Sequence, residues 1–311
     1  MKKNKVMIAF GGNALLKAGQ KGTFAEQNAN VKATCEALLS LFSEDKAIVI
    51  GHGNGPQVGN VMLQHAAGEK EHGIIAMPMD FCVAETQGSI AYLIENNLQN
   101  LLAEKNIHRK VISLVTEVLV DAADTAFQNP KKPVGPYYTK EQVDNFPKDG
   151  SVYAEDPKGN GWRKVVASPK PIDVKNIDIV QELAEQGHFV ITVGGGGIPV
   201  VLENGKYIGK EAVIDKDLAS ALAAIKIGAK EFYIITDVPN AYINFRKENE
   251  EKLEQITAEV AKKHLADGQF SEGSMAPKIR AAVYFAENSG GKCIITDAEH
   301  LTSGGTIIVN A

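Results

Sequence analysis

Short apolar runs alternate along this chain with longer segments in which apolar residues recur at helical spacing. The short runs predict strands buried on both faces of a sheet, because polar residues hardly interrupt them. They cover residues 6–10, 47–50, 189–193, 232–235, 293–295 and 306–309. Most of these runs lead directly into glycine or into Thr-Asp, so most of the predicted strands end in a tight turn.

The longer segments predict helices. An apolar stripe at i, i+4, i+7, i+8 and i+11 predicts a helix over residues 31–42, and a longer one follows over 90–102. Three more predicted helices, over 179–183, 218–225 and 277–286, are each followed by a glycine, which commonly ends a helix. Asn204-Gly205 predicts a β-hairpin. This alternation predicts an α/β fold, a three-layer αβα sandwich with a mostly parallel central sheet.

Residues 125–171 do not share this pattern. The stretch holds seven prolines and the single tryptophan, and its apolar residues show little periodicity. A structureless loop of this length would be unusual inside a compact domain. We therefore predict a small subdomain or lid that protrudes from the sandwich.

Composition narrows the class of protein. The chain has 311 residues, 44% of them hydrophobic, and a net charge of −5 without a run of like charges. These values are typical of a folded globular protein and argue against a nucleic-acid or membrane partner. No apolar stretch approaches the roughly 20 residues of a membrane span. Three widely spaced cysteines fit a reducing cytoplasm better than a disulfide framework or a zinc motif.

Four of the turns that follow predicted strands are rich in glycine or contain Thr-Asp: residues 11–13, 51–55, 194–197 and 236–237. The carboxyl ends of parallel strands share one edge of a sheet, where ligands bind. Glycine lets backbone N–H groups approach an anion closely, and a helix N-terminus adds partial positive charge. Each turn alone would be an ordinary connection, but together they favour a phosphate-bearing ligand. Residues 53–59 match neither the dinucleotide fingerprint nor a P-loop.

Three lysines are candidate partners for such phosphates. Lys132 lies in the irregular stretch, Lys216 is flanked by two aspartates at a helix start, and Lys278 follows Pro277. A single lysine is usually a solvated surface residue. A helix N-terminus disfavours a cation, so the position of Lys216 implies an anionic neighbour, which could be the aspartates, a phosphate or both. The histidines have no ligand spacing, and no nucleophilic serine or cysteine motif is present. Phosphoryl transfer to an acceptor that is already anionic fits this set best, because it needs positioning more than a general base.

Taken together, these motifs resemble the carbamate kinases of the amino-acid kinase superfamily over nearly the whole chain. The matching segments are FGGNAL (10–15), GHGNGPQVG (51–59), KPVGPYY (132–138), GGGGIP (194–199), VIDKD (213–217), MAPKIR (275–280) and TSGGT (302–306). The resemblance implies reversible phosphoryl transfer between carbamoyl phosphate and ADP, giving ATP and carbamate. Arginine catabolism in the ATP-forming direction is the family's usual setting. Another small-acid kinase and a nucleotide-binding sensor that has lost its chemistry are the alternatives.

The resemblance also assigns roles to residues. It implies a catalytic group of three lysines oriented by an aspartate: Lys132, Lys216, Lys278 and Asp217. A cradle for carbamoyl phosphate and the transferred phosphoryl group would comprise Gly11, Gly12, Asn13, Gly51, His52, Gly53, Asn54, Gly55, Gly194 and Gly195. A nucleotide pocket would comprise Thr236, Asp237, Val238, Tyr242, Met275 and Pro277. Mg²⁺ is implied as a cofactor held mainly by phosphates and water, with no protein ligand expected.

The resemblance further implies one domain over residues 1–311 and a homodimer. Residues 1–205 would form the carbamoyl-phosphate lobe, including the lid over 125–171, and residues 206–311 the nucleotide lobe. Several relatives, such as acetylglutamate and uridylate kinases, carry a lysine where this chain has Ala9. Lys132 is interpreted as its substitute from the lid, which favours carbamate kinase over those relatives. Arg163-Lys164 and Ala167 differ from the Arg-Arg and Pro associated with the family.

Overall fold

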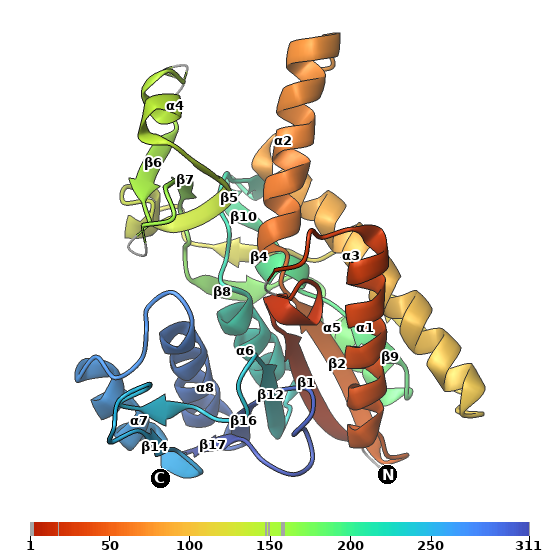
Figure 1. Ribbon diagram of the computed structural model, residues 1–311. Coiled ribbons are helices and arrows are strands. Elements are labelled where there is room, and N and C mark those ends of the chain that lie inside the picture. The colour runs from red at the N-terminus through yellow and green to blue at the C-terminus, as the bar shows by residue number, and fades with distance from the viewer. Residues whose placement is uncertain (1–2, 18, 147, 149, 157–158, 311) are drawn as a thin grey trace.

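A computed structural model describes residues 3–17, 19–146, 148, 150–156 and 159–310, apart from the side chain of Asn13. Its centre is an eight-stranded sheet in the order β15-β17-β16-β12-β1-β2-β9-β3 (Figure 1), in which only the β16–β17 pair is antiparallel. The strands are β1 (Asn4–Phe10), β2 (Lys46–His52), β3 (Val111–Ser113), β9 (Phe189–Ile191), β12 (Glu231–Ile235), β15 (Gln255–Thr257), β16 (Lys292–Thr296) and β17 (Thr306–Val309).

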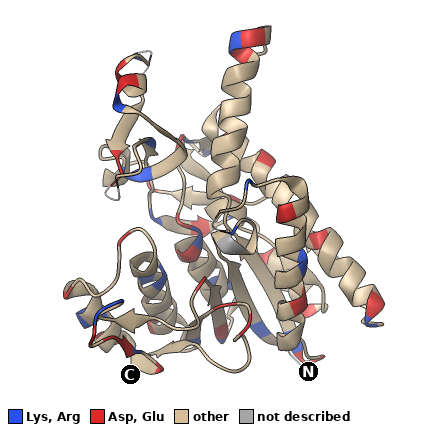
Figure 2. Cartoon of the chain, viewed as in Figure 1, with Lys and Arg blue, Asp and Glu red and all other residues tan. Residues whose placement is uncertain are grey.

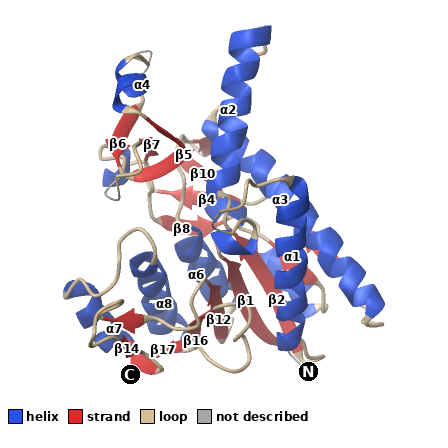
Figure 3. Cartoon of the chain, in the orientation of Figure 1, coloured by secondary structure: helices blue, strands red, loops and turns tan. Residues whose placement is uncertain are grey.

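Helices cover both faces of this sheet (Figure 3). In the part of the chain that the structure describes, the helices are α1 (Phe24–Leu38), α2 (Gly55–His72), α3 (Met79–Glu104), α4 (Lys140–Asp144), α5 (Ile177–Glu185), α6 (Lys216–Ile227), α7 (Ala258–Ala266) and α8 (Met275–Ser289). Buried residues of α5, α6, α7 and α8 form one hydrophobic cluster with one face of the sheet. Buried residues of α1 and α3 form a second cluster with the opposite face.

The first strand shows why the apolar runs are uninterrupted. Val6, Ile8 and Phe10 belong to the cluster with α1 and α3, whereas Met7 and Ala9 belong to the cluster on the other face. Because successive side chains of a strand point to opposite faces, a strand covered on both sides needs apolar residues at every position. The predicted three-layer αβα sandwich with a mostly parallel sheet is therefore confirmed.

Three smaller sheets complete the fold. A four-stranded sheet has the order β11-β10-β4-β8, and its strands are β11 (Lys206–Gly209), β10 (Ile198–Glu203), β4 (Glu117–Val120) and β8 (Pro171–Val174). The protruding segment holds a three-stranded sheet of β5 (Lys132–Tyr138), β7 (Trp162–Val166) and β6 (Val152–Glu155), together with α4 (Figure 1). A short pair joins β13 (Tyr242–Ile243) to β14 (Glu251–Lys252). Short 3₁₀ turns lie at Gly12–Ala14, Leu39–Leu41, Thr125–Phe127 and Gly194–Gly196.

Some local predictions need adjustment. Helix α8 begins at Met275, two residues before Pro277, so the proline occupies the third helical position. Helix α2 was not predicted, because only Val58 and Gly59 of its eighteen residues are buried and no apolar stripe results. The predicted lobe boundary at residue 205 falls in the turn of the β10–β11 hairpin, whose strands pair in one sheet. The division into lobes therefore stays a prediction.

Charged residues of both signs are interspersed along the elements (Figure 2). The exposed last turn of α2, for example, carries Glu69, Lys70 and Glu71. Among the described residues, none of the helices combines the length and the hydropathy that a membrane crossing requires.

Candidate active site

Three strand ends meet at the glycine turns predicted to bind phosphate. Phe10 of β1 lies opposite His52 of β2, and the Gly53 N–H donates to the Phe10 carbonyl at 3.2 Å. At Gly11 a Cβ atom would lie 2.4 Å from the carbonyl oxygen of Ile235, the last residue of β12. Glycine is therefore required where the first turn approaches the third strand.

The glycine turn after β9 packs against His52 and Asn54, at the end of β2. A Cβ atom on Gly194 would lie 2.4 Å from His52 Nε2, and one on Gly195 would lie 2.2 Å from Asn54 Nδ2. Gly195 also has φ +64°, a conformation that side chains other than glycine rarely adopt. A Cβ atom on Gly12 or Gly55 would meet no described atom within 4 Å, so the cradle is open at these two residues. The side chain of Asn13 lies outside the described residues.

The predicted lysines converge beside this cradle. Lys216 Nζ lies 2.5 Å from Asp217 Oδ1, and Lys278 Nζ lies 3.2 Å from Asp217 Oδ2. Both lysine side chains are 14% exposed, and that of Asp217 is 3% exposed. The stem of Lys216 lies along the cradle, because a Cβ atom on Gly53 would be 3.0 Å from its Cδ. Asp217 thus holds two nearly buried ammonium groups at the edge of the phosphate-binding turns.

Sequence reasoning did not assign Asp215 to the site. Its Oδ2 lies 2.9 Å from Lys132 Nζ, and its Oδ1 accepts from the backbone N–H groups of Asp217 and Leu218 at 3.0 and 3.3 Å. Burial raises the pKa of Asp215, but the charges of Lys132 and Lys216 outweigh burial and hold this pKa at about 2. Burial also lowers the pKa of Lys216, an effect that the Asp217 carboxylate opposes. An aspartate directly before a helix is an N-cap pattern, which was the signal available in the sequence.

A second group of polar residues, also missed, supports the cradle from α3. Asn54 Nδ2 donates to Thr86 Oγ1 at 2.9 Å. Gln87 bonds both backbone groups of Thr116: its Nε2 donates to the Thr116 carbonyl at 3.0 Å, and its Oε1 accepts from the Thr116 N–H at 2.8 Å. These residues are buried, so the Thr86 hydroxyl fixes the orientation of Asn54 and Gln87 fixes the backbone at Thr116. No sequence pattern marked them, because the contacts join residues far apart in the chain.

His52 lies at the end of β2 and is only 1% exposed. Its Nδ1 lies 3.0 Å from the Gly53 carbonyl oxygen, so the neutral ring carries its proton there and donates. Burial lowers the pKa of His52 to about 4, although this hydrogen bond opposes the shift. His52 is therefore uncharged near neutral pH.

The buried histidine predicts acid sensitivity. The unfolded chain binds a proton at His52 near pH 6.5 and the folded protein only near pH 4, so folding stability falls as pH drops through this window. His52→Asn keeps a donor to the Gly53 carbonyl and removes the titration. Urea unfolding at pH 7 and pH 4.5 should show that the wild type loses up to about 3 kcal/mol more than the variant. Equal losses in both proteins would contradict the neutral, buried state of His52.

The predicted nucleotide residues divide into two groups. Thr236 is adjacent to the cradle, because a Cβ atom on Gly11 would lie 3.7 Å from its Cα, and its hydroxyl donates to Asp237 Oδ1 at 3.0 Å. Met275 and Pro277 lie in the first turn of α8 together with Lys278. Val238 is half-buried in the following loop, and the Tyr242 ring packs 5.9 Å from that of Phe245. The contacts of the described residues do not join Val238 or Tyr242 to the lysines.

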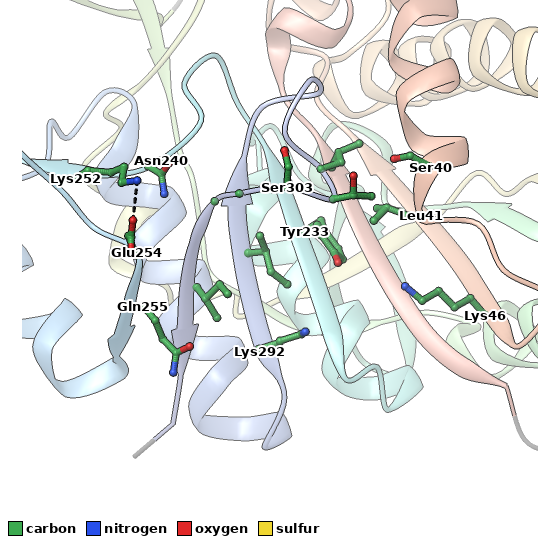
Figure 4. A pocket seen from close by; sticks show the side chains of 16 residues that line it. Ser40, Leu41, Lys46, Tyr233, Asn240, Lys252, Glu254, Gln255, Lys292 and Ser303 are labelled. Atoms are coloured by element: carbon green, nitrogen blue, oxygen red, sulfur yellow. Dashed lines mark ion pairs between the residues drawn. The ribbon is translucent and has the colours of Figure 1, made fainter.

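The TSGGT segment borders a cleft whose lining includes none of Lys132, Lys216 and Lys278. Residues 302–305 line a cleft of about 710 Å³ on the side of the sheet shown in Figure 4, together with Lys46, Tyr233 and Lys292. Thr306 is buried, and its hydroxyl donates to the Leu253 carbonyl at 2.6 Å and accepts from the Ala241 N–H at 2.8 Å. Thr306 therefore anchors the 240–253 connection to β17.

The base of the protruding segment is fixed to α2. A Cβ atom on Gly59 would lie 2.5 Å from the Cα of Gly135, so the two backbones touch. Arg163 donates to the Gly135 carbonyl from Nε at 2.9 Å and from Nη2 at 2.7 Å. Strand β5 therefore enters the segment at a fixed point, and Lys132 at its start reaches Asp215.

Comparison with known proteins agrees with this architecture. The model of the amino acid kinase family matches residues 4–297. Carbamate kinase of Thermococcus kodakarensis is 43% identical over 95% of this chain and 94% of its own length. This chain belongs to the carbamate kinases of the amino acid kinase family. Carbamate kinase of Oenococcus oeni, another member of the family, is 42% identical over 99% of both chains. The structure of Giardia lamblia carbamate kinase bound to AMP-PNP, also from this family, matches with a TM-score of 0.92 and 37% identity over 99% of both chains.

Proposed function

We propose that this protein transfers a phosphoryl group reversibly between carbamoyl phosphate and ADP, giving ATP and carbamate. The observation that carries the proposal is the convergence of Lys132, Lys216 and Lys278 on two aspartates beside an open glycine cradle. The similarity to proteins named carbamate kinase supports the choice of substrate.

The chemistry needs no general base at this site. His52 is neutral, and its Nδ1 proton is engaged by the Gly53 carbonyl. Asp215 and Asp217 are both paired with lysines. In the ATP-forming direction, the bond between phosphorus and the carbamoyl oxygen breaks, a bond between phosphorus and a β-phosphate oxygen of ADP forms, and carbamate leaves as an anion. The lysines would offset the charge on the transferring group.

Different turns of the site would bind the two substrates. Gly12, Gly55 and the turns around them would hold carbamoyl phosphate, because the cradle is open there. Thr236 and the first turn of α8 would bind ADP, because Thr236 adjoins Gly11 and Lys278 in that turn pairs with Asp217. Residues 1–205 and 206–311 would then be the two substrate lobes, with the 125–171 segment as a lid.

Mg²⁺ fits this site only as an ion held by phosphates and water. Three of the four carboxylate oxygens of Asp215 and Asp217 pair with lysines, and the fourth caps α6, so each already has a partner within the protein. Bound with the nucleotide, Mg²⁺ would supply charge neutralisation at the phosphates. The carboxylates of Asp215 and Asp217 would position the lysines beside the cradle.

The setting of the reaction is part of the proposal. An acyl phosphate is an energetic donor, which favours ATP formation, and arginine catabolism would supply it. Cys35, Cys82 and Cys293 are free and buried, which is compatible with a cytoplasmic protein. Homodimer formation rests on the family resemblance, and light scattering after size exclusion tests it.

The deciding experiment measures ATP formed from ADP, Mg²⁺ and carbamoyl phosphate, with acetyl phosphate and donor-free samples as controls. We expect rapid turnover with carbamoyl phosphate alone. Turnover with acetyl phosphate instead would indicate another small-acid kinase. Saturable ADP binding without turnover would indicate a sensor and would overturn the proposal.

Lys132 gives a specific prediction for this assay. Because Lys132 extends from the base of the lid and contacts Asp215 rather than the nucleotide turns, Lys132→Ala should lower kcat about 100-fold and leave ADP affinity nearly unchanged. Lys131→Ala is the matched control, since Lys131 is the exposed neighbour. Comparable losses in kcat and in ADP affinity would place Lys132 in nucleotide binding instead.

A further inference from the structure

Helix α2 projects away from the sheet and contacts α3 (Figure 1). Three side chains of these two helices come close together. His65 comes from α2, and Cys82 and Glu85 come from α3. His65 Nε2 lies 2.9 Å from Glu85 Oε2, and one ligand atom from each of the three residues lies within 4.8 Å of the other two. None of the three takes part in the lysine cluster or the cradle.

The three groups form a suitable donor set for a transition metal. A thiolate, an imidazole nitrogen and a carboxylate oxygen are all ligands of Zn²⁺. Cys82 and Glu85 are three residues apart, so they lie on one face of α3 and point toward the same neighbour. Bonds of about 2.0–2.3 Å in a tetrahedral site place the ligand atoms roughly 3.3–3.7 Å apart. The His65–Glu85 separation of 2.9 Å lies just below that range and the ligand atoms all lie within 4.8 Å of one another, so small side-chain movements suffice.

The cluster is accessible from solvent. His65 and Glu85 line a pocket of about 410 Å³, whose wall also includes Gln64 and Ser89. The side chain of His65 is 22% exposed and that of Glu85 is 37% exposed, whereas Cys82 is buried. An ion can therefore enter from the pocket, and water can occupy a fourth coordination position.

We propose that His65, Cys82 and Glu85 bind one zinc-type divalent ion that bridges α2 and α3. On binding, the Cys82 thiol releases its proton to solvent and a sulfur–metal bond forms. Helix α2 begins at Gly55 in the cradle and contacts Gly135 of the protruding segment through Gly59. The ion would therefore brace the helix that connects these two regions. This site is separate from the proposed phosphoryl transfer and does not depend on it.

Cobalt titration of the untagged, metal-free, full-length protein tests the site, because a cobalt–thiolate bond produces a near-ultraviolet charge-transfer band. We expect one Co²⁺ per chain, the band in the wild type, and its loss when Zn²⁺ is added. Cys82→Ser should abolish the band. His65→Ala and Glu85→Gln, at partly exposed positions, should weaken binding at least about tenfold. His72→Ala, an exposed histidine on the same helix, should bind as the wild type does.

Thermal unfolding provides a second measurement that does not depend on a cysteine variant. Zn²⁺ should raise the Tm of the wild type and of His72→Ala, because the ion binds only the folded chain, and should raise that of Glu85→Gln much less. A wild type without the cobalt band, a band that persists in Cys82→Ser, or unchanged affinity in both His65→Ala and Glu85→Gln would overturn the proposal. In that case the His65–Glu85 contact only joins the two helices.

Discussion

Lys216→Ala should lower kcat for ATP formation about 10²–10³-fold, the size expected when a preorganised donor to a developing charge is lost. The side chain is only 14% exposed, its stem lies along Gly53, and its ammonium group is fixed 2.5 Å from Asp217. Such a cation is already oriented before the substrate arrives, so it needs little reorganisation during the reaction. Steady-state kinetics with carbamoyl phosphate and ADP measure the effect.

The matched control for this variant is Lys226→Ala on the same helix. Lys226 lies in the last turn of α6, where it pairs with Asp173 at 2.8 Å and is 33% exposed. We expect this control to retain wild-type kcat. Thermal unfolding of both variants separates lost catalysis from lost folding. A Lys216→Ala enzyme within about threefold of wild-type turnover would remove Lys216 from the catalytic group, since a donor of this kind contributes far more.

The sequence predicted the parts of the fold that depend on local pattern. Strand β1 was predictable because both of its faces are buried, so every position from Val6 to Phe10 is apolar. Helix α2 was not, because it projects from the sheet and buries almost nothing. The four-stranded sheet was also missed as a unit: its strand β4 is short and pairs in parallel with β10, about 80 residues later in the chain.

The same distinction applies to the site. The glycine turns were found because a close backbone approach requires glycine, as at Gly195 beside Asn54. Thr86 and Gln87 were missed because ordinary polar residues acquire their role only when α3 packs against the cradle. The cluster at His65 and Cys82 was missed for the same reason, since seventeen positions separate two residues that the packing of two helices brings together.

Asp217→Ala should destabilise the fold by about 3–5 kcal/mol, because it leaves two nearly buried ammonium groups without their shared carboxylate. Urea unfolding at neutral pH measures this loss. Asp173→Ala, which breaks the exposed pair with Lys226, should reduce the unfolding free energy by no more than about 1 kcal/mol.

A double variant identifies the cause of that loss. Adding Lys278→Met to Asp217→Ala removes one of the two uncompensated charges, so the double variant should be more stable than Asp217→Ala alone. If it is less stable, the carboxylate acts mainly through packing and hydrogen bonds. Recovery of stability without recovery of activity is the expected combination, because Lys278 is itself proposed to act on the phosphates. That result would show that Asp217 stabilises the fold through its ion pair with Lys278.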